Sequence, residues 1–292
     1  SSFVAQEMPE LFGNAAVLAV HDYNDDGTLD VFVGNQAITN DFGSFPSSYL
    51  LKNTNGLLTK DSNNDLGTPG MVTDAIWDDF NGDGVKDLIV VGEWMAPVFY
   101  ANIKGKLKQT KVGVEDYSGL WQSILPFDID KDGDMDYLLG NWGENSKFTA
   151  SEKAPMRMYK DDFDGNGQSE TIVTTAKNGK YYPLQGLGEL SSQLVSLNKK
   201  YATYGDFAGQ EIEQILTADQ LKRASILEVN LLKSGYLKNE NGQFSFVPFD
   251  AFMQVGTTLQ TNFEKISDVF DRDFNRFATK FEGTADAIED VS

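Results

Sequence analysis

The chain has 292 residues, of which 44 are acidic and 24 basic, so its formal net charge is −20. This charge disfavours nucleic acid and anionic membrane surfaces as partners, because both bind basic protein faces. Cysteine is absent and His21 is the single histidine, which excludes disulfides and zinc–thiolate sites and leaves few routes to nucleophilic catalysis.

The composition predicts a folded chain. Hydrophobic residues make up 40% of it, enough to bury a core, and no run of about 18 apolar residues predicts a membrane-spanning helix. Because the sequence begins Ser1-Ser2, we expect a processed product whose signal peptide has been removed.

One acidic unit occurs four times, at residues 22–30, 79–87, 128–136 and 162–170. Its pattern is Asp-x-[Asp/Asn]-x-[Asp/Asn]-Gly-x-x-[Asp/Glu]. Oxygen atoms at positions 1, 3, 5 and 9, with the backbone carbonyl of position 7, can converge on one Ca²⁺, and glycine at position 6 permits the sharp turn. The pattern therefore predicts about four structural Ca²⁺ ions. The expected ligands are Asp22, Asn24, Asp26, Thr28, Asp30, Asp79, Asn81, Asp83, Val85, Asp87, Asp128, Asp130, Asp132, Asp134, Asp136, Asp162, Asp164, Asn166, Gln168 and Glu170.

The residues around each acidic unit favour strands over helices. An EF-hand would need a bidentate Glu at position 12 and a helix on each side, but position 12 is Val33, Val90, Leu139 or Val173 within β-rich runs. Apolar runs also precede each unit. Each repeat is therefore predicted to be a strand, a calcium loop and a second strand, rather than an ordinary Asp-Gly hairpin turn.

A second repeated element follows the acidic units. Residues 49–58, 98–107 and 236–244 have the pattern of a hairpin closed by a glycine-containing turn. Strand, loop, strand and hairpin together make a four-stranded antiparallel sheet of the length of a propeller blade. The intervals between the starts of successive acidic units are 57, 49 and 34 residues. The third interval is too short for a full blade with its hairpin, so the third blade is predicted to be shortened or rearranged.

These residues resemble the FG-GAP/VCBS repeats, the calcium-loop blades of integrin α-subunit propellers and of many bacterial surface proteins. The resemblance covers roughly residues 10–250. It implies a mainly β fold, a β-propeller of four-stranded antiparallel blades that is irregular or incomplete here. It also implies structural calcium on one rim and a secreted, periplasmic or cell-surface location. The segments at residues 92–95 and 140–143 also resemble bacterial members.

Two segments depart from the repeat pattern. Residues 187–224 carry leucine and isoleucine at helical spacing and predict two or three short helices inserted into a blade, as a packed cap or as a partner-binding elaboration. Residues 257–281 place Leu259, Phe270 and Phe281 on one stripe, which predicts an amphipathic helix. We expect a propeller domain over residues 1–255 and a C-terminal helix and tail over residues 256–292. The helix would dock on this chain or bind a partner subunit.

The preferred functional interpretation is a non-enzymatic binding, adhesion or scaffold module stabilised by calcium. The alternation of strands and loops places a set of polar and aromatic residues on the opposite rim, where they would contact a protein or glycan ligand or, in the case of the tryptophans, pack between blades. That set is Asn35, Glu93, Trp94, Asn141, Trp142 and Glu144. The alternatives are an enzyme or accessory domain acting on polysaccharide and a structural subunit of a cell-surface assembly.

Overall fold

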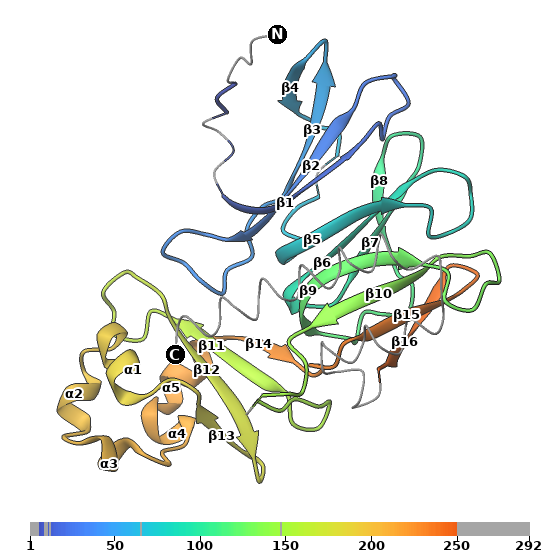
Figure 1. The fold of residues 1–292 in the computed structure, drawn as a ribbon. Coiled ribbons are helices and arrows are strands. Elements are labelled where there is room, and N and C mark those ends of the chain that lie inside the picture. Colours follow the sequence, from blue (N-terminus) through green and yellow to red (C-terminus); the bar gives the residue numbers. More distant parts are fainter. Residues whose placement is uncertain (1–5, 9–10, 12, 65, 147, 250–292) are drawn as a thin grey trace.

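The protein is mainly β and is built from antiparallel sheets in repeated four-stranded units (Figure 1). The computed structural model describes residues 6–8, 11, 13–64, 66–146 and 148–249. Three of these units follow one another as propeller-like blades, of which the second and third are joined edge to edge in one eight-stranded sheet, and a fourth sheet with short helices lies to one side of them. The fold is therefore that of an irregular β-propeller.

The first two blades are each formed by a continuous stretch of chain. Blade 1 has the strand order β1-β2-β3-β4 and blade 2 the order β5-β6-β7-β8. Their bounds are β1 (Asn14–His21), β2 (Asp30–Ala37), β3 (Tyr49–Thr54), β4 (Leu57–Lys60), β5 (Met71–Asp78), β6 (Asp87–Met95), β7 (Val98–Asn102) and β8 (Leu107–Thr110).

Blade 3 is interrupted by the fourth sheet, which explains the short third interval. Its first two strands are β9 (Gly119–Phe127) and β10 (Asp136–Asn141), and its outer hairpin is β15 (Gly235–Glu240) and β16 (Gln243–Pro248). Strand β10 pairs with β15, so the hairpin at residues 236–244 completes the third repeat and not the fourth. The intervening chain forms a sheet of order β13-β12-β11-β14. Its strands are β11 (Met156–Asp161), β12 (Glu170–Lys177), β13 (Lys180–Pro183) and β14 (Ser225–Val229).

The helical insertion lies within the fourth sheet, between β13 and β14. It has five short helices among the described residues rather than the two or three expected: α1 (Leu187–Gln193), α2 (Leu197–Lys200), α3 (Tyr204–Phe207), α4 (Ile212–Ile215) and α5 (Ala218–Arg223). Thr217 caps α5, because its side chain accepts the N–H of Gln220. The helices bury their apolar residues against Tyr159, Phe163 and Ile172 of the fourth sheet. The predicted C-terminal helix lies outside the described residues.

Blade 2 packs one face on blade 1 and the other face on blade 3. The core between blades 1 and 2 joins Phe32 and Leu50 of the first to Leu88 and Val90 of the second. The core between blades 2 and 3 is formed by the equivalent positions one blade further on. It joins Ile89 and Phe99 to Tyr137 and Leu139.

The hairpin turns and the loop glycines have the backbone conformation that their sequences require. Asn55 and Gly56, for example, both have positive φ, at 54° and 88°, which suits the tight turn between β3 and β4. The glycine at position 6 of each acidic loop is also left-handed, with φ of 84°, 84°, 98° and 86° for Gly27, Gly84, Gly133 and Gly167. A side chain at these positions would be strained.

Candidate metal centre

All four acidic loops connect the first two strands of a sheet. The loops lie between β1 and β2, β5 and β6, β9 and β10, and β11 and β12, so the predicted arrangement of strand, loop and strand is confirmed four times. Because the three blades are stacked in the same orientation, loops 1 to 3 share one rim of the propeller (Figure 1).

Backbone N–H groups fix the same turn in every loop. The aspartate at position 1 accepts a bond from the N–H at position 6, for example from Gly84 to Asp79 over 2.7 Å and from Gly167 to Asp162 over 2.8 Å. The equivalent bonds in loops 1 and 3 are 2.8 and 3.2 Å long. The side chain at position 5 accepts from the N–H at position 7 in each loop. The acidic side chains are therefore held within the turn rather than extended into solvent.

The acid at position 9 is buried in all four loops. Asp30 and Asp87 are 0% exposed, Asp136 is 1% exposed and Glu170 is 4% exposed. Burial, and secondarily the other carboxylates of the loop, raises the pKa of each of these groups and raises that of Asp87 to about 7. The backbone N–H groups that donate to these acids offset part of this effect, and a nearby positive charge would stabilise the charged form further.

Several buried carboxylate oxygens in the loops have no hydrogen-bond partner. In the part of the chain that the structure describes, four buried side-chain oxygens lack one, and three of these belong to loops 2 and 3: Asp87 Oδ2, Asp128 Oδ1 and Asp134 Oδ1. Buried polar atoms in folded proteins are almost always paired. Unpaired carboxylate oxygens inside an acidic turn are therefore the feature expected of metal ligands.

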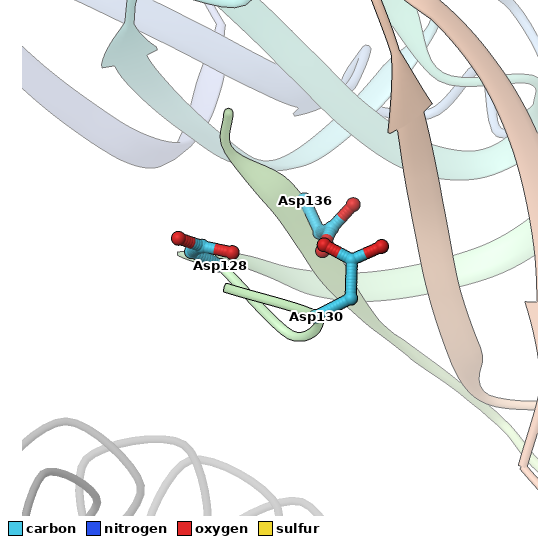
Figure 2. Close-up of side chains that lie close together, drawn as sticks. All are labelled: Asp128, Asp130 and Asp136. Carbon is cyan, nitrogen blue, oxygen red and sulfur yellow. The ribbon is translucent and has the colours of Figure 1, made fainter. Parts of the chain in front are cut away.

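Two loops bring three carboxylates into contact range. One oxygen from each of Asp128, Asp130 and Asp136 lies within 4.8 Å of the others, and the same holds for Asp162, Asp164 and Glu170. Figure 2 shows the first group, in which Asp128 and Asp130 project from the loop and Asp136 from the start of β10. These are positions 1, 3 and 9 of the predicted set, and the clusters can hold a metal ion.

Loops 1 and 2 have asparagine at position 3, which changes the local contacts. Asn24 donates its amide to Asp30 over 2.7 Å, and the Asn81 side-chain oxygen accepts the N–H of Asp83 over 2.9 Å. The amide oxygen of either residue is a suitable ligand for a hard cation. For Asn24 this requires a turn of the amide that presents its oxygen to the loop.

Two lysines that the sequence analysis did not consider lie against the loops. Lys52 on β3 contacts Asp26 at 3.1 Å, and Lys238 on β15 contacts Asp130 at 3.4 Å. Both occupy the same position of their hairpins. Each ammonium group places one positive charge beside a loop and so competes with a bound cation.

Three hairpin asparagines, also missed, connect each loop to the rest of its blade. The backbone N–H groups of Asn53, Asn102 and Asn239 donate to the acid at position 9 over 2.8, 2.7 and 2.8 Å. Their side-chain amides donate to the carbonyl at position 8 of the same loop. The signal that could have revealed them is the asparagine that stands three residues before the turn glycine in each hairpin.

Two of these asparagines also bridge neighbouring blades. The amide of Asn102 donates to the carbonyl of Tyr23 over 2.8 Å, and that of Asn239 donates to the carbonyl of Phe80 over 3.3 Å. Tyr23 and Phe80 occupy position 2 of the loop in the preceding blade. We call this contact the asparagine bridge.

The six residues predicted to face a ligand have different environments. Asn35 and Asn141 are 2% and 0% exposed, and their amides bond to backbone carbonyls. Glu144 is exposed and pairs with Lys233 at 3.5 Å. The remaining three, Glu93, Trp94 and Trp142, line one pocket of about 290 Å³ together with residues of the fourth sheet.

The fold and the repeated loops define a class: an irregular β-propeller with acidic loops between the first two strands of its blades. Residues 79–139 match the family model of the FG-GAP-like repeat, which extends from the first aspartate of loop 2 to Leu139 on β10. The chain thus contains an FG-GAP-like repeat, and the resemblance found in the sequence is confirmed. A search of curated proteins found no match. No helix in the described part of the chain is long and apolar enough to cross a membrane.

Proposed function

We propose that the protein is a calcium-stabilised binding module that works outside the cytoplasm and has no catalytic activity of its own. The observation that carries the proposal is the buried, unpaired carboxylate chemistry of the loops, with Asp87 Oδ2 and Asp128 Oδ1 as its clearest examples. In this proposal one Ca²⁺ binds in each loop, four in total, held by the side chains at positions 1, 3, 5 and 9 and by the carbonyl at position 7.

Calcium suits these loops better than magnesium. Ca²⁺ accepts six to eight oxygen ligands in irregular geometry, whereas Mg²⁺ retains several waters and rarely uses an all-protein cage. Each loop offers three or more acidic or amide side chains and no nitrogen or sulfur ligand of the kind that zinc prefers. The bound ion would supply positive charge that offsets the repulsion between the carboxylates of one turn.

The proposed location outside the cytoplasm follows from the low calcium affinity expected of such loops. Extracellular calcium modules bind with dissociation constants of about 10⁻⁴ to 10⁻³ M, which millimolar calcium outside the cell fills. The same loops in a compartment with submicromolar calcium would retain buried, unpaired carboxylates. We therefore propose a secreted, periplasmic or cell-surface protein.

The pocket that contains Trp142 is the best candidate for the ligand site. It opens at the ends of β6 and β10 that are opposite to the acidic loops. Trp142 is 47% exposed and lies 6.0 Å from the ring of Phe148, and Phe42 at the pocket is 46% exposed. Exposed aromatic rings beside a carboxylate suit a sugar ring or an apolar side chain of a protein ligand.

The floor and wall of this pocket are fixed by buried contacts. Trp94 is only 6% exposed and has a left-handed backbone, with φ of 58°, at an irregular pairing of β6 with β9. Such strain costs on the order of 1–3 kcal/mol and persists only where packing enforces it. The carboxylate of Glu93 accepts a bond of 2.8 Å from Gln122. Trp94 thus forms the base of the pocket, while Glu93 presents an oriented acid at its edge.

The metal part of the proposal is tested by metal analysis and chelation of the intact chain. We expect calcium in the purified protein after dialysis against millimolar CaCl₂, and a large fall of the melting temperature in EGTA. Asp79→Ala and Asp130→Ala should each remove one ion. Protein that retains no calcium and melts at the same temperature in EGTA would refute the proposal.

The ligand part is tested separately with glycan and peptide arrays in calcium. Binding that is lost in Trp142→Ala and weakened in Glu93→Gln would support this pocket. Leu57→Ala, an exposed apolar residue on blade 1, is the matched control. Binding that is unchanged in both pocket variants would place the ligand elsewhere and would leave the metal proposal untouched.

A further inference from the structure

Blade 1 has an exposed apolar sheet face on the side away from blade 2. Leu18 and Val20 on β1 are 65% and 52% exposed. They pair across the sheet with Val33 and Val31 on β2, which are partly exposed. We call these four side chains the blade 1 patch. Adjacent exposed apolar side chains of this kind mark a surface that binds something.

The β1 positions of the blade 1 patch are buried in the other two blades. Leu18 stands four residues before its loop, as do Ala75 and Ile124, which are 6% and 4% exposed. Both of these residues belong to the cores between blades. Leu18 therefore stands where blades 2 and 3 each contact the blade before them.

The β2 side of the patch follows the same rule. Val31 and Val33 occupy positions 10 and 12 of their repeat. The equivalent residues in the next two blades are 0% exposed: Leu88, Val90, Tyr137 and Leu139. The patch is therefore one half of an interface that this protein builds twice within its own chain, and its occupant must supply a matching apolar surface.

The blade 1 patch continues into a cavity between the blades. The first strands of the three blades, β1, β5 and β9, line this cavity, which has a volume of about 520 Å³. Leu18 and Val20 are among the lining residues, together with Val17 and Ile124. An occupant of the patch can therefore also bury apolar side chains in the cavity.

The C-terminal segment of the chain carries a matching apolar surface. The structure describes no residue after Phe249, which follows β16 of blade 3. The sequence of residues 257–281 predicts an amphipathic helix whose apolar stripe includes Phe263, Phe270 and Phe277. As a helix the stripe would be about 33 Å long, whereas β1 is about 27 Å long, so it can cover the whole strand.

The residues before the predicted helix are enough to reach blade 1. Packed sheets lie about 10 Å apart, which places blade 1 about 20 Å from blade 3. Residues 250–258 can extend over about 30 Å. A tethered segment meets the patch at an effective concentration on the order of millimolar. Two separate chains instead repel each other, because each has a net charge of −20.

We propose that residues 257–281 form an amphipathic helix that docks its apolar stripe on the blade 1 patch of the same chain. The helix takes the place that the preceding blade holds in the two interfaces between blades, and it closes the open end of the stack. Its polar residues, among them Lys265, Asp268 and Arg272, remain in solvent. The proposal is independent of the calcium and ligand sites proposed above.

Hydrogen exchange of the full chain in millimolar calcium tests the docking. We expect the amides of residues 257–281 to be protected, and Leu18→Lys to speed their exchange at least about tenfold, because it places a charge in the contact. Val20→Lys should have the same effect. Both positions are exposed in the blades, so the melting temperature of the blades should not change. Ile103→Lys, at a position 55% exposed on the blade 2 hairpin, is the matched control and should leave the protection unchanged.

Two results of this experiment would overturn the proposal. Wild-type amides of residues 257–281 that exchange at the rate of an unfolded peptide would show that the segment does not dock. Protection that neither Leu18→Lys nor Val20→Lys reduces would show that it docks elsewhere.

Disulfide formation tests whether the helix and the patch belong to one chain, because no native cysteine competes. Val20→Cys is combined in one chain with Phe263→Cys, Phe270→Cys or Phe277→Cys. At about 1 µM protein, mild oxidation should link at least one of these pairs within a single chain. Ile103→Cys combined with the same cysteines should form no link. Links that join two chains would overturn the proposal in favour of a second copy as the occupant, and the absence of any link would also overturn it.

Discussion

Replacement of Asp87 by asparagine should stabilise the metal-free protein at pH 7.5, and calcium should cancel most or all of that gain. The carboxyl is 0% exposed, and burial raises its pKa from 3.8 to about 7. A folded-state pKa above that of the unfolded chain means that the group favours folding fully below about pH 4 and loses this contribution as the pH rises through about 7. The charged, metal-free carboxylate then costs at most about 4 kcal/mol at pH 7.5.

The asparagine variant removes this cost but adds a smaller one. The amide oxygen can still accept the N–H of Asn102, now 2.7 Å from Asp87 Oδ1, whereas the amide nitrogen replaces an oxygen that has no partner. An unpaired buried donor costs about 1–3 kcal/mol. In EGTA at pH 7.5 we therefore expect Asp87→Asn to be more stable than the wild type by about 1–3 kcal/mol, and at pH 5 we expect that gain to fall to about zero.

Calcium should cancel most or all of the variant's advantage. A site with a dissociation constant of about 10⁻⁴ to 10⁻³ M adds roughly 1.4–2.7 kcal/mol at 10 mM calcium, and Asp87→Asn loses this contribution from loop 2. Urea unfolding followed by tryptophan fluorescence, with and without calcium at both pH values, measures all four differences. Asp116→Asn, an exposed acid outside the loops, is the control. A variant that is destabilised equally in EGTA at pH 5 and pH 7.5 would refute the reasoning.

Three further predictions concern the asparagine bridge, a competing lysine and the two pocket tryptophans. Asn102→Ala leaves the Tyr23 and Lys86 carbonyls without their donor and should cost about 3 kcal/mol in urea unfolding, more than a matched Asn53→Ala; equal losses would argue against the bridge. Lys238→Met removes the ammonium beside Asp130 and should tighten calcium binding up to about fivefold in calorimetry, whereas an unchanged affinity would show that the lysine does not compete. Trp142→Ala should change the free energy of unfolding by less than about 0.5 kcal/mol, and Trp94→Ala should lower it by about 3–5 kcal/mol; similar losses would contradict their different burial.

The features that the sequence predicted correctly depend on short-range chemistry. The left-handed glycine at position 6, the strands on both sides of each loop and the hairpin closed at Asn55 and Gly56 all follow from a few adjacent residues. Burial of leucine and isoleucine in the helical insertion likewise follows from their spacing. Four repetitions of one pattern made these local inferences mutually consistent.

The features that the sequence did not reveal depend on contacts between distant segments. Strand β10 pairs with β15, for example Leu138 with Tyr236, although all the residues of the fourth sheet lie between these two strands in the sequence. No local periodicity encodes that partner. The burial of Trp94 results from the fourth sheet, whose Met156 and Met158 cover it. A tryptophan at the end of a strand can face solvent or a neighbouring sheet, and only the tertiary arrangement decides between them.

Because of the asparagine bridges, the first three loops would not behave as separate sites if they bound metal ions. Asn102 contacts the acid at position 9 of its own loop through its N–H and the carbonyl of Tyr23, in the preceding loop, through its amide. Since Tyr23 lies between two predicted ligands of loop 1, the backbone that an ion fixes in loop 1 also positions the strand that supports loop 2. Loop 4 stands outside this chain of bonds. Among the described residues its acid Glu170 accepts the N–H of Phe163, as Asp136 accepts that of Ile129, but no hairpin asparagine donates to Glu170. Ions bound in loops 1 to 3 would therefore be coupled to the packing of the blades, whereas an ion bound in loop 4 would stabilise the inserted sheet alone.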